Sequence, residues 1–153
     1  MYSSVNAARF GNDFIFLLQR GGLLGQTSVF YFHDCPEVYF YQRPTLLETR
    51  PVEEVLKDYC QNNSVLIVSD AGAARAHYDQ ERVCATRLFL NKLSQYTYLY
   101  AWLNPMPEDR WTGTTAGEIA HLLPMYQLDR EGLNDIVNIL RGQPFPPEFS
   151  LNE

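Results

Sequence analysis

The chain contains 153 residues, of which 46% are hydrophobic and 20% are charged. This composition is typical of one globular domain whose core needs no disulfide bond or structural metal. The net charge of −6 comes without a basic run or face, which argues against a broad nucleic-acid or anionic-membrane surface. No signal peptide fits the start of the sequence, and no apolar run is long enough to span a membrane, so we expect a cytoplasmic protein. The three cysteines have no metal-ligand spacing, and we expect their thiols to be reduced.

The first part of the chain predicts a helix and then a β-hairpin. Residues from about Val5 to Gln19 carry apolar side chains close to helical spacing: Ala8, Phe14, Leu17 and Leu18. Two glycines follow this predicted helix, and no strand precedes it. Two aromatic, β-rich runs, Ser28–Phe32 and Val38–Tyr41, are separated by five loop residues, which predicts an antiparallel hairpin.

The middle of the chain predicts a helix, a buried strand and a second helix. Pro51 begins a segment with apolar residues at i, i+3, i+4 and i+7, which is typical of a helix. Val65–Val68 is a short β-branched run and predicts a strand buried on both faces. Asp79 is a plausible N-cap for a long helix from about Gln80 to Leu93, with Val83, Leu90 and Leu93 facing inward.

The last part predicts two more strands, each followed by a helix. Tyr98–Leu103 and Met125–Leu128 are the predicted strands. Thr115 and Glu118 match a capping box for a helix that runs through Leu123. Asp129 is the predicted N-cap of a final helix with four apolar residues on one face: Leu133, Ile136, Val137 and Leu140.

This alternation predicts one three-layer α/β domain over residues 1–142, followed by a loose, proline-rich tail over residues 143–153. We expect a mainly parallel sheet with helices on both faces, and the hairpin predicts one antiparallel edge strand. At the carboxyl edge of such a sheet, where ligands bind, the sequence places Ser69-Asp70-Ala71-Gly72.

A family resemblance is carried by three features: the early hairpin, Ser69-Asp70-Ala71-Gly72 after one strand, and Trp102-Leu103-Asn104-Pro105 after the next. Together they resemble von Willebrand factor A-like domains of the CoxE-like branch, over roughly residues 5–141. The resemblance implies a Rossmann-like sheet with a Mg²⁺ or Mn²⁺ ion in a metal-ion-dependent adhesion site. It also implies partnership with a MoxR-type AAA+ ATPase.

The resemblance assigns Asp70 as a metal ligand, and either Thr45 or Thr49 lies in about the right loop for the family's threonine. The family's Asp-x-Ser-x-Ser motif and the central first strand that carries it are absent from the predicted elements. We therefore expect an N-terminally truncated domain with an incomplete metal site. Another chain, a second copy or a rearranged sheet would then fill the gap.

Other candidate residues lie on the same predicted edge. Ser69, Asn104 and Thr114 are expected in a polar rim that could contact a partner, and an exposed Trp111 near Met106 would suit a protein contact. Thr115 is explained equally well by helix capping.

Asp34 lies after the first hairpin strand, where it either joins Asp70 to hold a metal for phosphoryl chemistry or is a simple turn residue. The three histidines, His33, His77 and His121, are isolated and suggest no catalytic order.

Two functions follow as expectations. The favoured one is a non-enzymatic adaptor that binds a protein partner through the loops at the carboxyl edge, with neither nucleic acid nor membrane involved. The alternative is a Mg²⁺-dependent hydrolase, of phosphatase or nuclease type, that uses Asp34 and Asp70.

Overall fold

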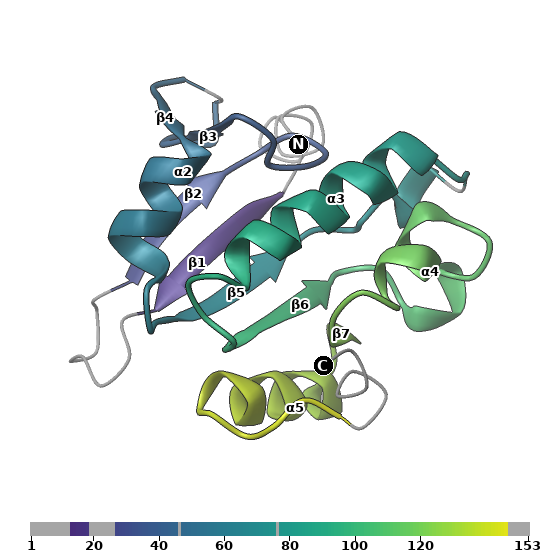
Figure 1. Cartoon of the computed structure of the whole chain (residues 1–153). Coiled ribbons are helices and arrows are strands. Elements are labelled where there is room, and N and C mark those ends of the chain that lie inside the picture. The colour runs from purple at the N-terminus through teal and green to yellow at the C-terminus, as the bar shows by residue number, and fades with distance from the viewer. Residues whose placement is uncertain (1–12, 19–26, 46, 76, 147–153) are drawn as a thin grey trace.

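The computed structural model describes residues 13–18, 27–45, 47–75 and 77–146. Within these residues the chain forms a seven-stranded sheet with the order β4-β3-β2-β1-β5-β6-β7 (Figure 1). The strands are β1 (Phe14–Leu18), β2 (Thr27–Tyr31), β3 (Tyr39–Tyr41), β4 (Thr49–Pro51), β5 (Ser64–Val68), β6 (Tyr100–Asn104) and β7 (Met125–Gln127).

Helices lie on both faces of the sheet. One face carries α2 (Val52–Val55), which continues as a π-helical segment (Leu56–Cys60), together with α3 (Gln80–Leu93) and α4 (Thr115–Ile119). The other face carries α5 (Arg130–Leu140), seen below the sheet in Figure 1. The predicted α/β class is therefore confirmed, with the sheet between two helical layers.

Alternate residues of β5 divide between two hydrophobic cores. Val65 and Ile67 point to the larger core, under α2, α3 and α4. Leu66 and Val68 point to the smaller core, where Ile136 of α5 is buried. This alternation follows from the twofold period of a strand, and it confirms that β5 is buried on both faces.

Residues Phe14–Leu18 form a strand, so the predicted helix is wrong over this segment; residues 5–12 and 19 lie outside the described residues. A short apolar run suits a buried helix or a buried strand equally well. Here β1 pairs with β2 on one side and β5 on the other, so its backbone groups are bonded along both edges. The expected gap in the middle of the sheet is therefore also wrong, because β1 fills it.

The sheet is mixed, and not mainly parallel with one antiparallel edge strand. Within the described sheet, only the pairs β5–β6 and β6–β7 are parallel. Strand β1 is antiparallel to both β2 and β5, and β3 and β4 continue the antiparallel order. The predicted hairpin is confirmed by the pairing of Tyr31 with Tyr41, whereas β4 was not predicted.

Two predicted caps are confirmed and one is wrong. The Asp79 carboxylate accepts the Arg82 N–H at 3.1 Å at the start of α3, and Asp129 accepts the Gly132 N–H at 2.7 Å at the start of α5. Thr114, and not Thr115, caps α4, which ends at Ile119 and not at Leu123. The capping box was off by one residue because adjacent threonines suit the position equally.

The predicted apolar face of α5 is only partly buried. Ile136 is buried and Leu140 packs against the smaller core, whereas Leu133 and Val137 are exposed. Of the predicted tail, residues 147–153 lie outside the described residues.

The antiparallel direction of β1 brings its first residues to the carboxyl edge of β5. Because Phe14 pairs with Val68, the start of β1 lies beside the carboxyl end of β5. Asp13, which precedes β1, is thereby brought to the edge that carries Ser69 and Asp70.

Candidate functional site

Asp70 follows β5 directly, and its carboxylate stabilises the turn that leaves the strand. Its Oδ1 accepts the Gly72 N–H at 2.8 Å. Gly72 has φ +89°, and a Cβ there would lie 3.0 Å from Cβ of Thr115, so this position requires glycine. Asp70 therefore lies at the predicted edge, with one of its oxygens already engaged by the backbone.

Ser69 is buried beneath this turn. Its Oγ accepts the Ala71 N–H at 3.0 Å, and its carbonyl accepts the Trp102 indole N–H at 2.8 Å. With 1% of its surface exposed, Ser69 holds the turn and faces away from any partner in solution.

Asp13 and Asp34 join the same edge from β1 and from the loop after β2. The Asp34 N–H donates to Oδ2 of Asp13 at 3.1 Å. Asp13 is 8% exposed, and burial raises the pKa of its carboxyl, while a hydrogen bond with Ser69 and the charge of Arg82 act in the opposite direction.

Arg82, from the first turn of α3, lies among these groups with 6% of its side chain exposed. Its Nε donates to the Asp34 carbonyl at 3.0 Å, and its Nη1 lies 3.6 Å from Oδ1 of Asp34. Its Nη2 lies 3.5 Å from Oγ of Ser69 and 3.9 Å from Oδ1 of Asp70. We call Asp13, Asp34, Ser69, Asp70 and Arg82 the Arg82 cluster. The structure thus brings Asp34 and Asp70 to one guanidinium.

Asp13 and Arg82 are two members of the cluster that were not predicted. Asp13 lies within the segment of residues 5–19 that was predicted as a helix, so nothing placed it at this edge. Arg82 gave a usable signal, since it lies on the buried stripe of α3 with Thr86, Phe89 and Leu93 at i+4, i+7 and i+11. A charged residue on the buried stripe of a helix indicates a buried ionic partner.

Thr45 and Thr49, the candidate metal threonines, do not lie near Asp70. Both are exposed, and β3, β2 and β1 separate the β4 strand of Thr49 from β5. Neighbouring strands are about 4.8 Å apart, so β4 and β5 are on the order of 19 Å apart across the sheet. Among the described residues, no three His, Cys, Asp or Glu side chains are grouped so as to hold a metal ion.

Asn104 is fully buried, so it does not form part of an exposed polar rim as expected. Its Nδ2 donates to the Asp70 carbonyl at 3.0 Å, and its Oδ1 accepts the Met106 N–H at 2.9 Å. Asn104 therefore connects the loops that follow β5 and β6, and fixes their relative position.

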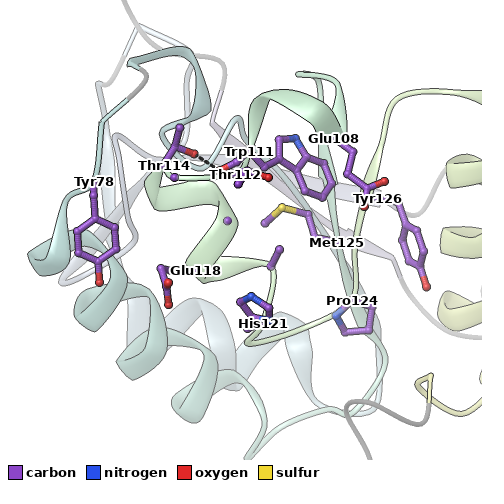
Figure 2. Close-up of a pocket in the computed structure, with 13 residues that line it drawn as sticks. Tyr78, Glu108, Trp111, Thr112, Thr114, Glu118, His121, Pro124, Met125 and Tyr126 are labelled. Carbon is purple, nitrogen blue, oxygen red and sulfur yellow. Dashed lines mark hydrogen bonds between the residues drawn. The ribbon is translucent and has the colours of Figure 1, made fainter.

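A groove of about 780 Å³ lies beside α4, and Trp111 and Thr114 are among its lining residues. Figure 2 shows the indole of Trp111 beside Met125, with Tyr78 and Tyr126 toward opposite ends of the groove. Trp111 is 6% exposed, so the expectation of an exposed tryptophan is wrong; its indole N–H donates to the Met106 carbonyl at 2.9 Å, which holds the ring in place. We call this the Trp111 groove. Its lining also includes Glu108, Glu118 and His121 and contains neither lysine nor arginine.

The described residues around His33 contain no activated thiol. Cys35 lies two residues away, and burial raises the pKa of its thiol to about 11. A thiol with this pKa is protonated at neutral pH and is a poor nucleophile. The Thr86 hydroxyl donates to its sulfur at 3.5 Å, and the thiol in turn lies 3.8 Å from the Pro36 carbonyl oxygen.

Comparison with protein-family models, with curated proteins and with solved structures finds no match to this chain. No helix among the described residues is long and apolar enough to cross a membrane.

Proposed function

We propose that this chain is a non-enzymatic adaptor module of von Willebrand A type, with an incomplete metal-ion-dependent adhesion site, that binds a protein partner in the cytoplasm. The observation that carries the proposal is the Trp111 groove, an open concave surface whose lining includes Trp111, Met125 and Tyr126. The sequence resemblance supports a MoxR-type AAA+ ATPase as the partner.

The lining of the Trp111 groove indicates the chemistry of the bound segment. Aromatic residues and methionine are enriched at the centres of protein interfaces, and here Trp111, Tyr126 and Met125 line the groove. Glu108 and Glu118 give it negative charge without a basic residue in the lining. A partner segment that presents lysine or arginine beside an apolar residue therefore complements it.

Charge reversal in the groove tests this proposal. Glu118→Lys should weaken binding to a purified MoxR-type AAA+ ATPase about tenfold, as measured by isothermal titration calorimetry, because it places a cation beside the basic partner segment. The matched control is Glu131→Lys, which changes an exposed glutamate in the first turn of α5, on the opposite face of the sheet. Equal effects of the two variants, or no binding by the unchanged chain, would overturn the proposal.

An activity assay separates the adaptor from the hydrolase alternative, which is favoured by the approach of Asp34 and Asp70 to the same guanidinium. The adaptor proposal predicts no hydrolysis of p-nitrophenyl phosphate or of a DNA oligonucleotide in the presence of Mg²⁺. Turnover that is lost in both Asp34→Asn and Asp70→Asn would establish the hydrolase instead.

A further inference from the structure

The contacts of Arg82 join three segments that are far apart in the sequence. Its guanidinium hydrogen-bonds the Asp34 carbonyl in the loop after β2 at 3.0 Å and lies 3.9 Å from the Asp70 carboxylate after β5. Its backbone is fixed at the same time, because its N–H donates to the Asp79 cap of α3 at 3.1 Å. The guanidinium is therefore fixed at the carboxyl edge of the sheet both by its side-chain contacts and by the hydrogen bond of its backbone.

The charges around Arg82 require a cation at this position. Asp13 and Asp34 are hydrogen-bonded to each other through the Asp34 N–H, and Asp70 approaches the same guanidinium. Asp13 is buried, whereas the side chains of Asp34 and Asp70 are 37% and 32% exposed. Carboxylates gathered at such a partly buried position are unfavourable without a positive partner. A guanidinium supplies that charge at every physiological pH, because it does not lose its proton in proteins.

The packing leaves little space between the guanidinium and the turn after β5. A Cβ on Gly72 would lie 3.3 Å from Nη1 of Arg82, so the backbone of this turn closes directly over the guanidinium. The neighbouring Ser69 Oγ, which lies 3.5 Å from Nη2, also accepts the Ala71 N–H. The oxygen acceptors at this edge are therefore arranged around the guanidinium of Arg82, and do not fit the divalent metal that the von Willebrand A resemblance implies.

We propose that Arg82 is the resident cation of this edge and takes the place of the divalent metal. The domain consequently folds without Mg²⁺ or Mn²⁺, and its loops hold one arrangement at any metal concentration. The role of Arg82 is tested by the thermal stability of the chain. Its test is therefore independent of whether a partner binds to the Trp111 groove.

Thermal melts of the full chain test the proposal. The midpoint of the unchanged chain should be the same in EDTA, in 5 mM Mg²⁺ and in 5 mM Mn²⁺. Arg82→Gln should lower the midpoint by about 10 °C, because it leaves the buried Asp13 and the partly buried Asp34 and Asp70 without the counter-charge of Arg82. Arg82→Lys should lower it by only about half as much, since the charge is kept and the hydrogen bond from Nε is lost.

The matched control is Arg75→Gln, because Arg75 also lies 3.2 Å from the Asp34 carboxylate but is 51% exposed. It should change the midpoint by less than about 1 °C, as is usual for an exposed ion pair. A double variant separates the effect of charge from that of packing. Adding Asp13→Asn to Arg82→Gln should raise the melting midpoint above that of Arg82→Gln alone, because it removes a carboxylate that has lost its counter-charge. A purely structural role of Arg82 would not produce this recovery. Two results would overturn the proposal: a melting midpoint of the unchanged chain that rises with added metal, or an Arg82→Gln variant whose midpoint equals that of the unchanged chain.

Discussion

At the scale of single residues, Asp13 makes stability depend on pH. Burial raises the pKa of its carboxyl above the ordinary value of 3.8, so the folded chain holds this proton more tightly than the unfolded chain does. As the pH rises through the window between the unfolded and folded pKa values, the contribution of Asp13 to the free energy of unfolding should therefore fall.

Asp13→Asn removes this titration and retains a side-chain oxygen that accepts the Asp34 N–H. The melting midpoint of the variant minus that of the unchanged chain should become more positive between pH 4 and pH 7. Melts at unit steps of pH measure this difference. A difference that stays constant, or that becomes more negative, would show that another group governs the acid response.

The candidate site could be predicted from the sequence only in part. Asp70 directly follows a short β-branched run, so its position at the carboxyl edge could be predicted from the neighbouring residues alone. Asp13 and Arg82 reach the same edge only because β1 and α3 pack against β5. This proximity depends on contacts between segments that are distant in the sequence. Neither the spacing of residues along the chain nor their types indicates such contacts.

At the scale of elements, Gly132 determines how α5 approaches the sheet. A Cβ at this position would lie 2.2 Å from the Gln127 carbonyl oxygen, which is backbone at the end of β7. Alanine normally stabilises a helix relative to glycine. Here Gly132→Ala should instead lower the melting midpoint by about 5 °C, because the added methyl group forces α5 away from β7.

Asn134→Ala is the control, since it changes an exposed residue of the same helix and should leave the midpoint equal or slightly higher. Differential scanning calorimetry of both variants measures the effect. If Gly132→Ala melts at or above the unchanged chain, the close approach of α5 to β7 is wrong.

Some elements could be predicted and others could not. The bounds of α3 and the caps at Asp79 and Asp129 are as predicted, because their signals lie within a few residues of one another. Phe14–Leu18 was assigned to a helix because an apolar run of five residues has no decisive period of its own. Its pairing partners, β2 and β5, determine its conformation.

At the scale of the whole molecule, the two halves of the sheet are built differently. From β5 onward the chain alternates strands and helices, and β5, β6 and β7 lie side by side in chain order. This order follows from the usual rule for parallel strands joined by helices, so it could be predicted. In the other half, β1 lies between β2 and β5. This arrangement pairs segments that are about 50 residues apart in the sequence, and it was not predicted.

The place of β1 has a consequence for local opening of the molecule. Its amides face β2 on one side and β5 on the other, so the antiparallel and parallel halves cannot separate without breaking one of its two ladders. In hydrogen–deuterium exchange, the amides of β1 and β5 should therefore exchange most slowly and together, through global unfolding, while those of the edge strand β4 exchange first. Fast exchange in β1 would mean that the sheet opens along its centre as two independent units. Slow, matched exchange would mean that the described sheet is one cooperative body, with β1 as the strand that joins its halves.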